Sequence, residues 1–203
     1  MIEASVEYTL NGFYLKANIN VEGFTSLWGS NGAGKTTLLR IIAGVYKVQK
    51  GSIGADGVDL TRVDISKRRI VLVDANTYIP HMNVKEHIDW GRRVGKSTRS
   101  LDEAVEGAFG LQRELFDRKV GVLSVGNRAR VSIATAFASG PRAVLIDDIL
   151  SNIDKKEEVM SMIKVAGEKV GVDVLYTHQL KNDLPQIYDA DYKIEQGICI
   201  KQQ

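Results

Sequence analysis

The sequence predicts an α/β fold with a mixed β-sheet, and three features of the chain lead to that prediction. Apolar and polar residues alternate from Tyr14 to Val21, which is typical of an antiparallel strand with one buried face. Ile70–Val73 is a continuous apolar run, which indicates a strand covered on both faces. In the second half of the chain, strand-like runs alternate with stretches of helical spacing. Parallel and antiparallel strands are therefore both expected.

Length and composition place the chain among globular domains. It has 203 residues, of which 44% are hydrophobic and 26% charged, so one domain can bury a sizeable core without disulfides. The net charge of +2 does not indicate a nucleic acid as partner. Its single cysteine, Cys199, favours a reducing compartment. We see neither a signal peptide nor an apolar run near the ~18 residues of a membrane span, and expect a cytoplasmic chain.

The first part of the chain is expected to form a hairpin and then a strand, a glycine-rich turn and a helix. Phe24–Trp28 fits a short buried strand that leads directly into the turn. Residues 37–43 have helical spacing, and Gly44 is a suitable helix stop. A second hairpin is expected over residues 51–58.

Residues 78–122 differ from the rest of the chain, because helical patterns dominate there. Asn83 with Glu86, and Ser100 with Glu103, have the spacing of capping boxes. We therefore predict a small helical subdomain at about 78–122, inserted in a core formed by 1–77 and 123–203. The expected elements after it are a helix at 128–139, a strand at 143–146, a helix after 154, a strand at 172–176 and a hairpin at 196–197.

Residues 29–36 carry the strongest functional signal. Their glycines allow the backbone to wrap around phosphates with its N–H groups pointing inward. Lys35 is expected to reach the β and γ phosphates and Thr36 to offer its hydroxyl to Mg²⁺, while the helix from Thr37 presents its positive end. The run consists of Gly29, Ser30, Asn31, Gly32, Ala33, Gly34, Lys35 and Thr36.

Two acidic residues, Asp147 and Asp148, follow the apolar run Ala143–Ile146. At the end of a buried strand, the first carboxylate can hold a magnesium-bound water and the second can polarise an attacking water. Acidic residues often end strands, so this pattern is weak by itself. Combined with the glycine-rich loop, it predicts a phosphate-loop nucleotide hydrolase.

With three further motifs in their order, the chain resembles the ATP-binding-cassette family over essentially its whole length. Leu123–Asn127 resembles the family's signature Leu-Ser-Gly-Gly-Gln, with Ser124 and Gly126 retained. The resemblance implies that this segment caps the γ-phosphate of the opposite subunit's ATP. It also implies a dimer-contact role for Asp154 and a switch role for His178, which ends the strand after the acidic one. The core would be RecA-like with an antiparallel β subdomain.

The resemblance further implies an aromatic side chain that stacks on adenine. Tyr8 lies at about the right distance before the phosphate loop, with Phe13 and Tyr14 as rivals and a plain core role as the alternative. The implied cofactors are ATP and Mg²⁺. The implied partners are a second cassette chain and a transmembrane permease subunit at the cytoplasmic face of the membrane.

Three departures from the family pattern predict slow hydrolysis with ordinary ATP binding. Asp148 stands where the family has glutamate, so its carboxylate has one methylene less reach. Residues 73–76 contain no glutamine, although the family has one there. Val125 and Asn127 replace a glycine and a glutamine of the signature. A displacement of about 1 Å at a reacting centre can cost roughly 10²-fold in rate.

The predicted function is the ATP-binding subunit of a transporter, in which ATP closes two chains head to tail. Two alternatives stay open: a soluble cassette ATPase of the assembly or repair type, and a regulatory cassette with little catalysis. A long coiled coil is excluded, because only about ninety residues separate Lys35 from Ser124. Scattered basic residues between positions 62 and 99 are interpreted as a solvated face.

Overall fold

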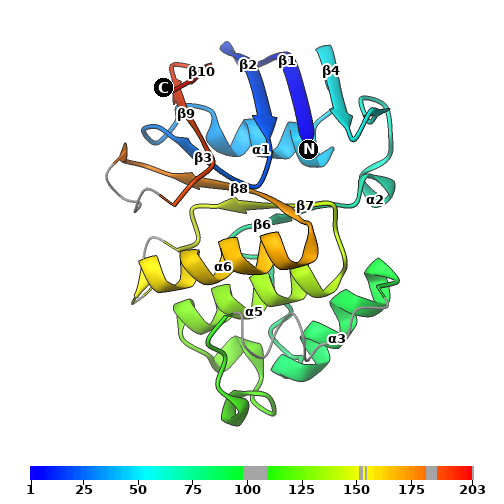
Figure 1. Cartoon of the computed structure of the whole chain (residues 1–203), viewed down its shortest axis with the longest axis vertical. Helices are drawn as coiled ribbons and strands as arrows, with labels where there is room; N and C mark the ends of the chain where they lie inside the picture. The colour runs from blue at the N-terminus through cyan, green and yellow to red at the C-terminus, as the bar shows by residue number, and fades with distance from the viewer. Residues whose placement is uncertain (98–108, 151–152, 154, 182–186, 203) are drawn as a thin grey trace.

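The computed structural model describes residues 1–97, 109–150, 153, 155–181 and 187–202. Its strands form one mixed sheet in the order β5-β4-β1-β2-β10-β9-β3-β8-β7-β6, so the predicted α/β class is confirmed (Figure 1). The strands are β1 (Ile2–Leu10), β2 (Phe13–Val21), β3 (Phe24–Trp28), β4 (Lys50–Ala55), β5 (Val58–Asp59), β6 (Ile70–Val73), β7 (Ala143–Asp147), β8 (Asp173–His178), β9 (Ala190–Glu195) and β10 (Ile198–Lys201).

One half of the sheet is mostly antiparallel and follows the alternation seen in the sequence. In β2 the residues Leu15, Ala17, Ile19 and Val21 are buried and those between them are exposed. β1 joins β2 through residues 11–12, an Asn-Gly pair with φ angles of 49° and 82°, as a two-residue hairpin requires. The expected hairpins β4–β5 and β9–β10 are also present.

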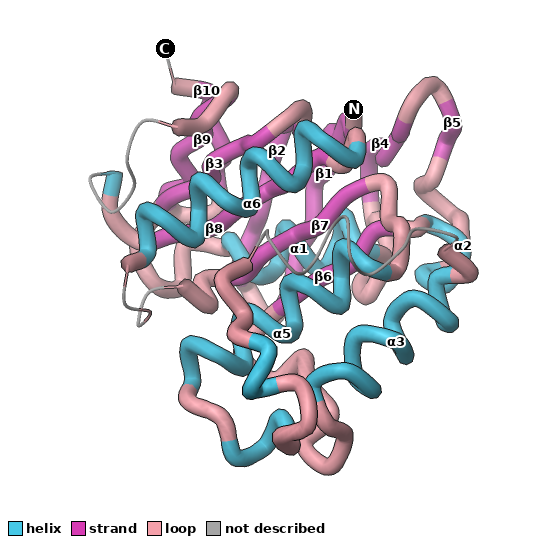
Figure 2. The backbone as a smooth tube through the Cα atoms, turned by 60° about the horizontal axis from the view of Figure 1, so that its bottom comes forward, coloured by secondary structure: helices cyan, strands magenta, loops and turns pink. Residues whose placement is uncertain are grey.

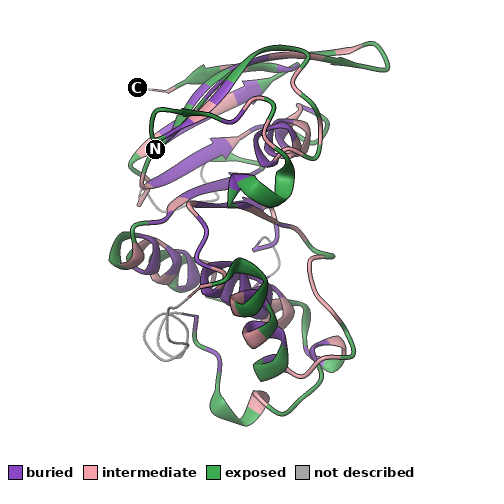
Figure 3. Ribbon diagram, turned by 90° about the vertical axis from the view of Figure 1, so that its right-hand side faces the viewer, coloured by how far each residue is buried: buried purple, intermediate pink, exposed green. Residues whose placement is uncertain are grey.

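The other half is parallel and lies between two helical layers. β3, β8, β7 and β6 pair side by side in parallel, and β3 and β7 are buried almost throughout. One face packs against α1 and the other against α5 and α6, so the buried residues form two clusters separated by the sheet (Figures 2 and 3). The helices are α1 (Lys35–Ala43), α2 (Ile65–Arg68), α3 (Val84–Gly95), α5 (Val125–Ala138) and α6 (Lys156–Val170).

The predicted helix boundaries hold in part. Asn83 and Glu86 form the expected capping box at the start of α3, whereas the Ser100 and Glu103 pair lies outside the described residues. The helix predicted from residue 128 begins at Val125 instead, because the Ser124 hydroxyl accepts from the Asn127 N–H and caps it one turn earlier. Between α3 and α5, the described residues contain two short 3₁₀ turns, at 113–115 and 120–122.

Two further sequence expectations concern membranes and the cysteine. Within the described ranges, no helix has both the length and the apolar composition needed to cross a membrane. Burial raises the pKa of the Cys199 thiol to about 12, so the side chain is a neutral thiol rather than a reactive thiolate.

A buried histidine joins α3 to α5 and to the chain segment before α3. The His87 side chain is only 2% exposed, and its Nε2 accepts a 3.0 Å hydrogen bond from the Ile79 N–H. Its Nδ1 lies 2.7 Å from the Thr135 hydroxyl, which donates to the Val131 carbonyl, so Nδ1 is the donor. Both nitrogens are satisfied only in the neutral ring, and burial lowers the pKa of His87 from 6.5.

This burial makes stability depend on pH. The folded pKa lies below the unfolded value, so the unfolded chain takes up the proton first and stability falls as pH drops below 6.5. We expect His87→Gln to flatten the decline in unfolding free energy between about pH 7.5 and 5.5, measured by urea denaturation. His81→Asn, at an exposed histidine, is the control and should keep the wild-type slope. An equal slope in wild type and His87→Gln would contradict the assignment.

Candidate active site

The glycine-rich loop turns sharply between β3 and α1, and its tight packing demands glycine at two positions. Gly34 has a φ of 111°, and a methyl group there would lie 3.0 Å from Cζ of Phe13. At Gly29 a methyl group would collide with the backbone oxygen of Ile194. α1, which is described throughout, has no capping side chain and no acidic residue in its first turn. Its N–H groups and positive end therefore suit an anion.

Lys35 is folded over this loop. Its Nζ donates to the carbonyl oxygens of Gly29 and Ser30 at 2.6 and 3.1 Å, and the residue is 7% exposed. Burial lowers the pKa of Lys35, and the charges of Asp148 and Asp147 oppose that shift. The ammonium group therefore lies in the field of both acidic side chains predicted for the site.

The carboxylate of Asp147 joins the loop to the parallel strands. Its Oδ2 accepts from the Thr36 hydroxyl at 2.7 Å, across 111 residues of sequence, and its Oδ1 accepts from the Thr177 hydroxyl at 2.9 Å. Thr177 is the register partner of Asp147 in the pairing of β8 with β7. A hydroxyl and one carboxylate are the protein donors that a Mg²⁺ ion uses when phosphates and water complete its shell. The site residues present therefore fit this ion.

Asp148 follows directly at the strand end. Its φ of 46° is in the left-handed region, which aspartate tolerates better than most residues. The side-chain amide of Gln179 donates to its Oδ2 at 3.1 Å. Nothing in the sequence pattern singled out Gln179, because the contact depends on how the ends of β7 and β8 lie together.

His178 is buried at 1% exposure and lies on the other face of β8 from Thr177. Its Nε2 is 2.8 Å from the Ser26 hydroxyl and its Nδ1 is 2.8 Å from the Leu180 carbonyl. A carbonyl only accepts, so Nδ1 carries a proton, and in the neutral ring Nε2 accepts from Ser26. The switch role of His178 remains a prediction. In that role, the ring would have to break its hydrogen bond with the Ser26 hydroxyl.

The three candidate aromatic side chains occupy different places. Tyr8 stacks on Tyr46, with ring centroids 5.8 Å apart and planes 1° from parallel. Tyr14 is 43% exposed. Phe13 is the candidate whose ring lies against the phosphate loop, at Gly34. The sequence spacing favoured Tyr8, but the hairpin turn before Phe13 brings β2 to the loop.

The signature segment lies on a different part of the molecule. Ser124 caps α5, and a methyl group at Gly126 would meet side-chain atoms of Ile153 no closer than 3.6 Å. Val122 and Val125 flank the cap and are 74% and 54% exposed. α5 and α1 cover opposite faces of the sheet (Figure 2). Asp154, with Ser151 and Asn152, lies outside the described residues.

In the segment where the family has its glutamine, the Asp74 side chain makes hydrogen bonds within its own turn. Oδ1 of Asp74 accepts from the Asn76 N–H and from the Thr77 hydroxyl, both at 2.9 Å. Asp74 therefore stabilises its own turn, and this engagement weighs against its acting as a substitute for the missing glutamine.

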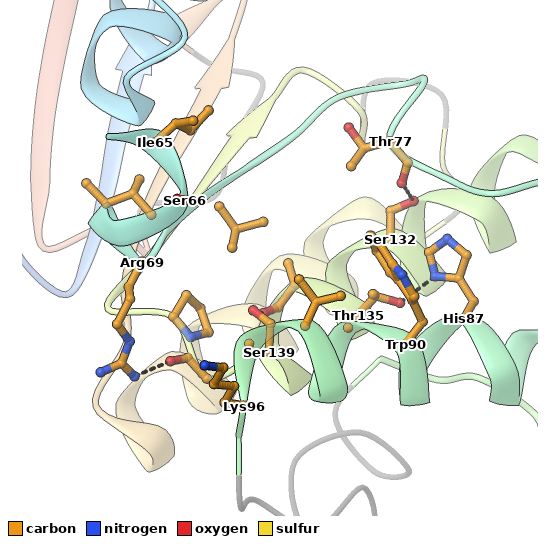
Figure 4. A pocket seen from close by; sticks show the side chains of 18 of the residues that line it. Ile65, Ser66, Arg69, Thr77, His87, Trp90, Lys96, Ser132, Thr135 and Ser139 are labelled. Atoms are coloured by element: carbon orange, nitrogen blue, oxygen red, sulfur yellow. Dashed lines mark hydrogen bonds between the residues drawn. The ribbon is translucent and has the colours of Figure 1, made fainter. Parts of the chain in front are cut away.

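A groove of about 790 Å³ opens between α3, α5 and the chain around β6 (Figure 4). His87 and Thr77 lie near one end, and Arg69 and Lys96 near the other. Its lining is largely apolar, and the apolar residues on it are Ile65, Ile70, Val71, Ile79, Trp90, Val94, Ala136 and Pro141.

Comparison with known proteins gives a consistent result. The family model described as ABC transporter matches residues 14–151. The molybdenum import ATP-binding protein ModC of Methylococcus capsulatus is 34% identical over 201 residues, covering 93% of this chain and 56% of that protein. The spermidine/putrescine import ATP-binding protein PotA of Haemophilus influenzae is 34% identical over 176 residues, covering 83% of this chain and 47% of that protein. The chain thus spans about half the length of these relatives.

Solved structures agree on the fold. CbiO1 from Clostridium perfringens, described as part of the ABC transporter complex cbiONQ, superposes with a TM-score of 0.82 at 22% identity, covering 98% of this chain and 86% of that one. The bacterial ABC transporter cassette MJ0796, solved as a dimer, gives a TM-score of 0.79 at 22% identity, covering 100% of this chain and 99% of that one.

Proposed function

This chain belongs to the ABC transporter family, and from that premise we propose that it is an ATP-binding subunit. In this proposal it binds MgATP at residues 29–36 and hydrolyses it slowly in a head-to-tail dimer, which drives transport through a separate membrane subunit. The contact between the Thr36 hydroxyl and the Asp147 carboxylate, beside the buried Lys35, is the observation that carries the proposal. It brings the glycine-rich loop and an acidic residue at the end of a parallel strand together, which supports a site for a nucleotide and Mg²⁺.

Each side chain has a distinct part in the reaction. The Lys35 ammonium group exchanges its loop carbonyls for β and γ phosphate oxygens. Thr36 and Asp147 would hold the Mg²⁺ ion, which would supply positive charge against the phosphates. Asp148 orients and polarises the attacking water. Its short side chain is the reason that we expect weak turnover with normal nucleotide binding.

The second cassette chain completes the site. The α5 cap, with Ser124 and Gly126, lies across the sheet from the chain's own loop, so it is available to a partner's γ-phosphate. The exposed Val122 and Val125 would be covered in such a dimer. The dimer-contact role of Asp154 and the switch role of His178 belong to this proposal.

The groove beside α3 is suited to a segment of the membrane subunit. Apolar residues line it, and it borders both α3, from the region 78–122, and the Thr77–Ile79 chain between β6 and α3. An inserted apolar helix would therefore contact the layer that carries the signature cap. This contact would hold the chain at the cytoplasmic face of a membrane. The names of the relatives mention different cargoes, molybdenum and spermidine/putrescine, and we propose none for this chain.

A regulatory cassette is the second candidate. The observations that favour it are the exposed Val125 in the signature and the short carboxylate at Asp148. In this version the chain binds ATP and pairs with a different cassette, whose own signature and glutamate complete one active composite site. Rapid ATP hydrolysis by the purified chain alone, at tens per second, would exclude this version.

The first prediction from the proposed function concerns the phosphates. Lys35→Ala should weaken MgATP binding by roughly 10- to 150-fold, since a charged hydrogen bond contributes about 1.5–3 kcal/mol. It should also prevent ATP-dependent dimerisation. Asp148→Asn should bind MgATP normally and strengthen the dimer, because bound ATP persists. Calorimetry and size-exclusion chromatography measure the two properties. Wild-type behaviour of both variants would overturn the proposed mechanism.

The second prediction separates the aromatic candidates. If Phe13 stacks on adenine, Phe13→Ala should weaken ATP binding by roughly 5- to 150-fold, which corresponds to about 1–3 kcal/mol of stacking. Tyr8→Ala is the matched control and should change the affinity by less than about 2-fold. Neither variant should alter binding of inorganic tripolyphosphate. A larger loss in Tyr8→Ala than in Phe13→Ala would return the role to Tyr8.

The third prediction concerns the groove. Val94→Asp places a charge on its apolar lining, at a side chain that is 64% exposed. We expect this variant to lose copurification with a multi-span membrane protein while it keeps MgATP binding. Val165→Asp on α6, at 61% exposure and away from the groove, is the control and should keep both. Equal copurification of the two variants would place the partner elsewhere.

A further inference from the structure

We propose that Gln179 is a positioning residue for Asp148, whose carboxylate it holds in the orientation that water activation needs. The inference rests on the proposed function, because it assigns Asp148 to hydrolysis. The observation behind it is the 3.1 Å hydrogen bond from Nε2 of Gln179 to Oδ2 of Asp148. This contact joins the end of β7 to the residue that follows β8.

The backbone fixes both partners of this contact. Asp147 and Thr177 are register partners and also share a side-chain hydrogen bond, so β7 and β8 end side by side. On the β8 side, the Gly29 N–H donates to the His178 carbonyl at 3.3 Å, which ties the strand end to the phosphate loop. The His178 ring then bonds the Leu180 carbonyl. Gln179 therefore leaves the sheet from a defined position next to the loop.

Asp148 shares the electrostatic environment of the phosphate-binding residues. Against the lowering by burial, both carboxylates raise the pKa of Lys35, and Asp148 has the larger effect of the two. A neutral amide donor can orient one carboxylate oxygen without cancelling the negative charge that a general base requires. A cation at position 179 would compete for this charge, and a carboxylate would repel it.

Because the side chain of Asp148 is short, the orientation of its carboxylate matters more than it would for a glutamate. Glutamate reaches one carbon–carbon bond further, about 1.5 Å, which is more than the ~1 Å displacement that costs roughly 10² in rate. An aspartate can therefore activate water only if its carboxylate is held in one favourable orientation. Gln179 provides that restraint, and a glutamate at position 148 would need it far less.

The test is a double-mutant cycle on steady-state ATP hydrolysis. Gln179→Ala should lower kcat by about 10-fold and leave KM within about 2-fold, because the contact acts on the chemical step and not on nucleotide binding. In an Asp148→Glu background the same change should lower kcat by less than about 2-fold. Gln179→Glu should be at least as slow as Gln179→Ala. Gln179 is exposed, so we expect its substitutions to leave the fold intact, and circular dichroism checks the fold of Asp148→Glu.

Three results would overturn the inference. An equal loss of kcat from Gln179→Ala in both backgrounds, or a raised KM, would mean that Gln179 contacts the nucleotide or water itself. An unchanged kcat in Gln179→Ala would mean that the hydrogen bond is only a surface contact. Calorimetry with MgATP separates these results from a failure of the proposed function, which would appear as absent nucleotide binding in the wild type.

Discussion

The hydrogen bond between Thr36 and Asp147 is the contact on which the arrangement of this site depends. It forms only because β3, β8 and β7 are adjacent parallel strands, whose carboxyl ends meet at one edge of the sheet. Thr177, on the strand between them, donates to the other oxygen of Asp147. A carboxylate held by two hydroxyl groups has a defined orientation at the strand end, beside the glycine-rich loop.

In the proposed dimer, the division of the core by the sheet is the reason that one chain would form only part of a composite site. α1 and the phosphate loop belong to one buried cluster, whereas α5 and its cap belong to the other. The layer around α5 is tied together by buried polar contacts such as that of His87 with Thr135 and Ile79.

The departures from the family pattern lie around the reaction rather than at phosphate binding. Lys35, Thr36 and Asp147 are retained and lie together at the glycine-rich loop, while Asp148 is short and Val125 is exposed in the signature. Gln179 beside Asp148 indicates compensation within the same strand ends. A subunit of this kind would keep strong ATP-dependent association and make its turnover depend on the exact placement of one carboxylate.

The sequence by itself determined the fold class, most strands, the phosphate loop and the two acidic residues, because these follow from local periodicity and local spacing. The start of α5 was placed three residues late, since its cap is a single hydroxyl contact. The position of Phe13 against Gly34, the Ser26 contact of His178 and the Gln179 contact of Asp148 were decided only by the tertiary structure. Each joins segments far apart in the chain, and strand order and register, which no local pattern encodes, bring them together.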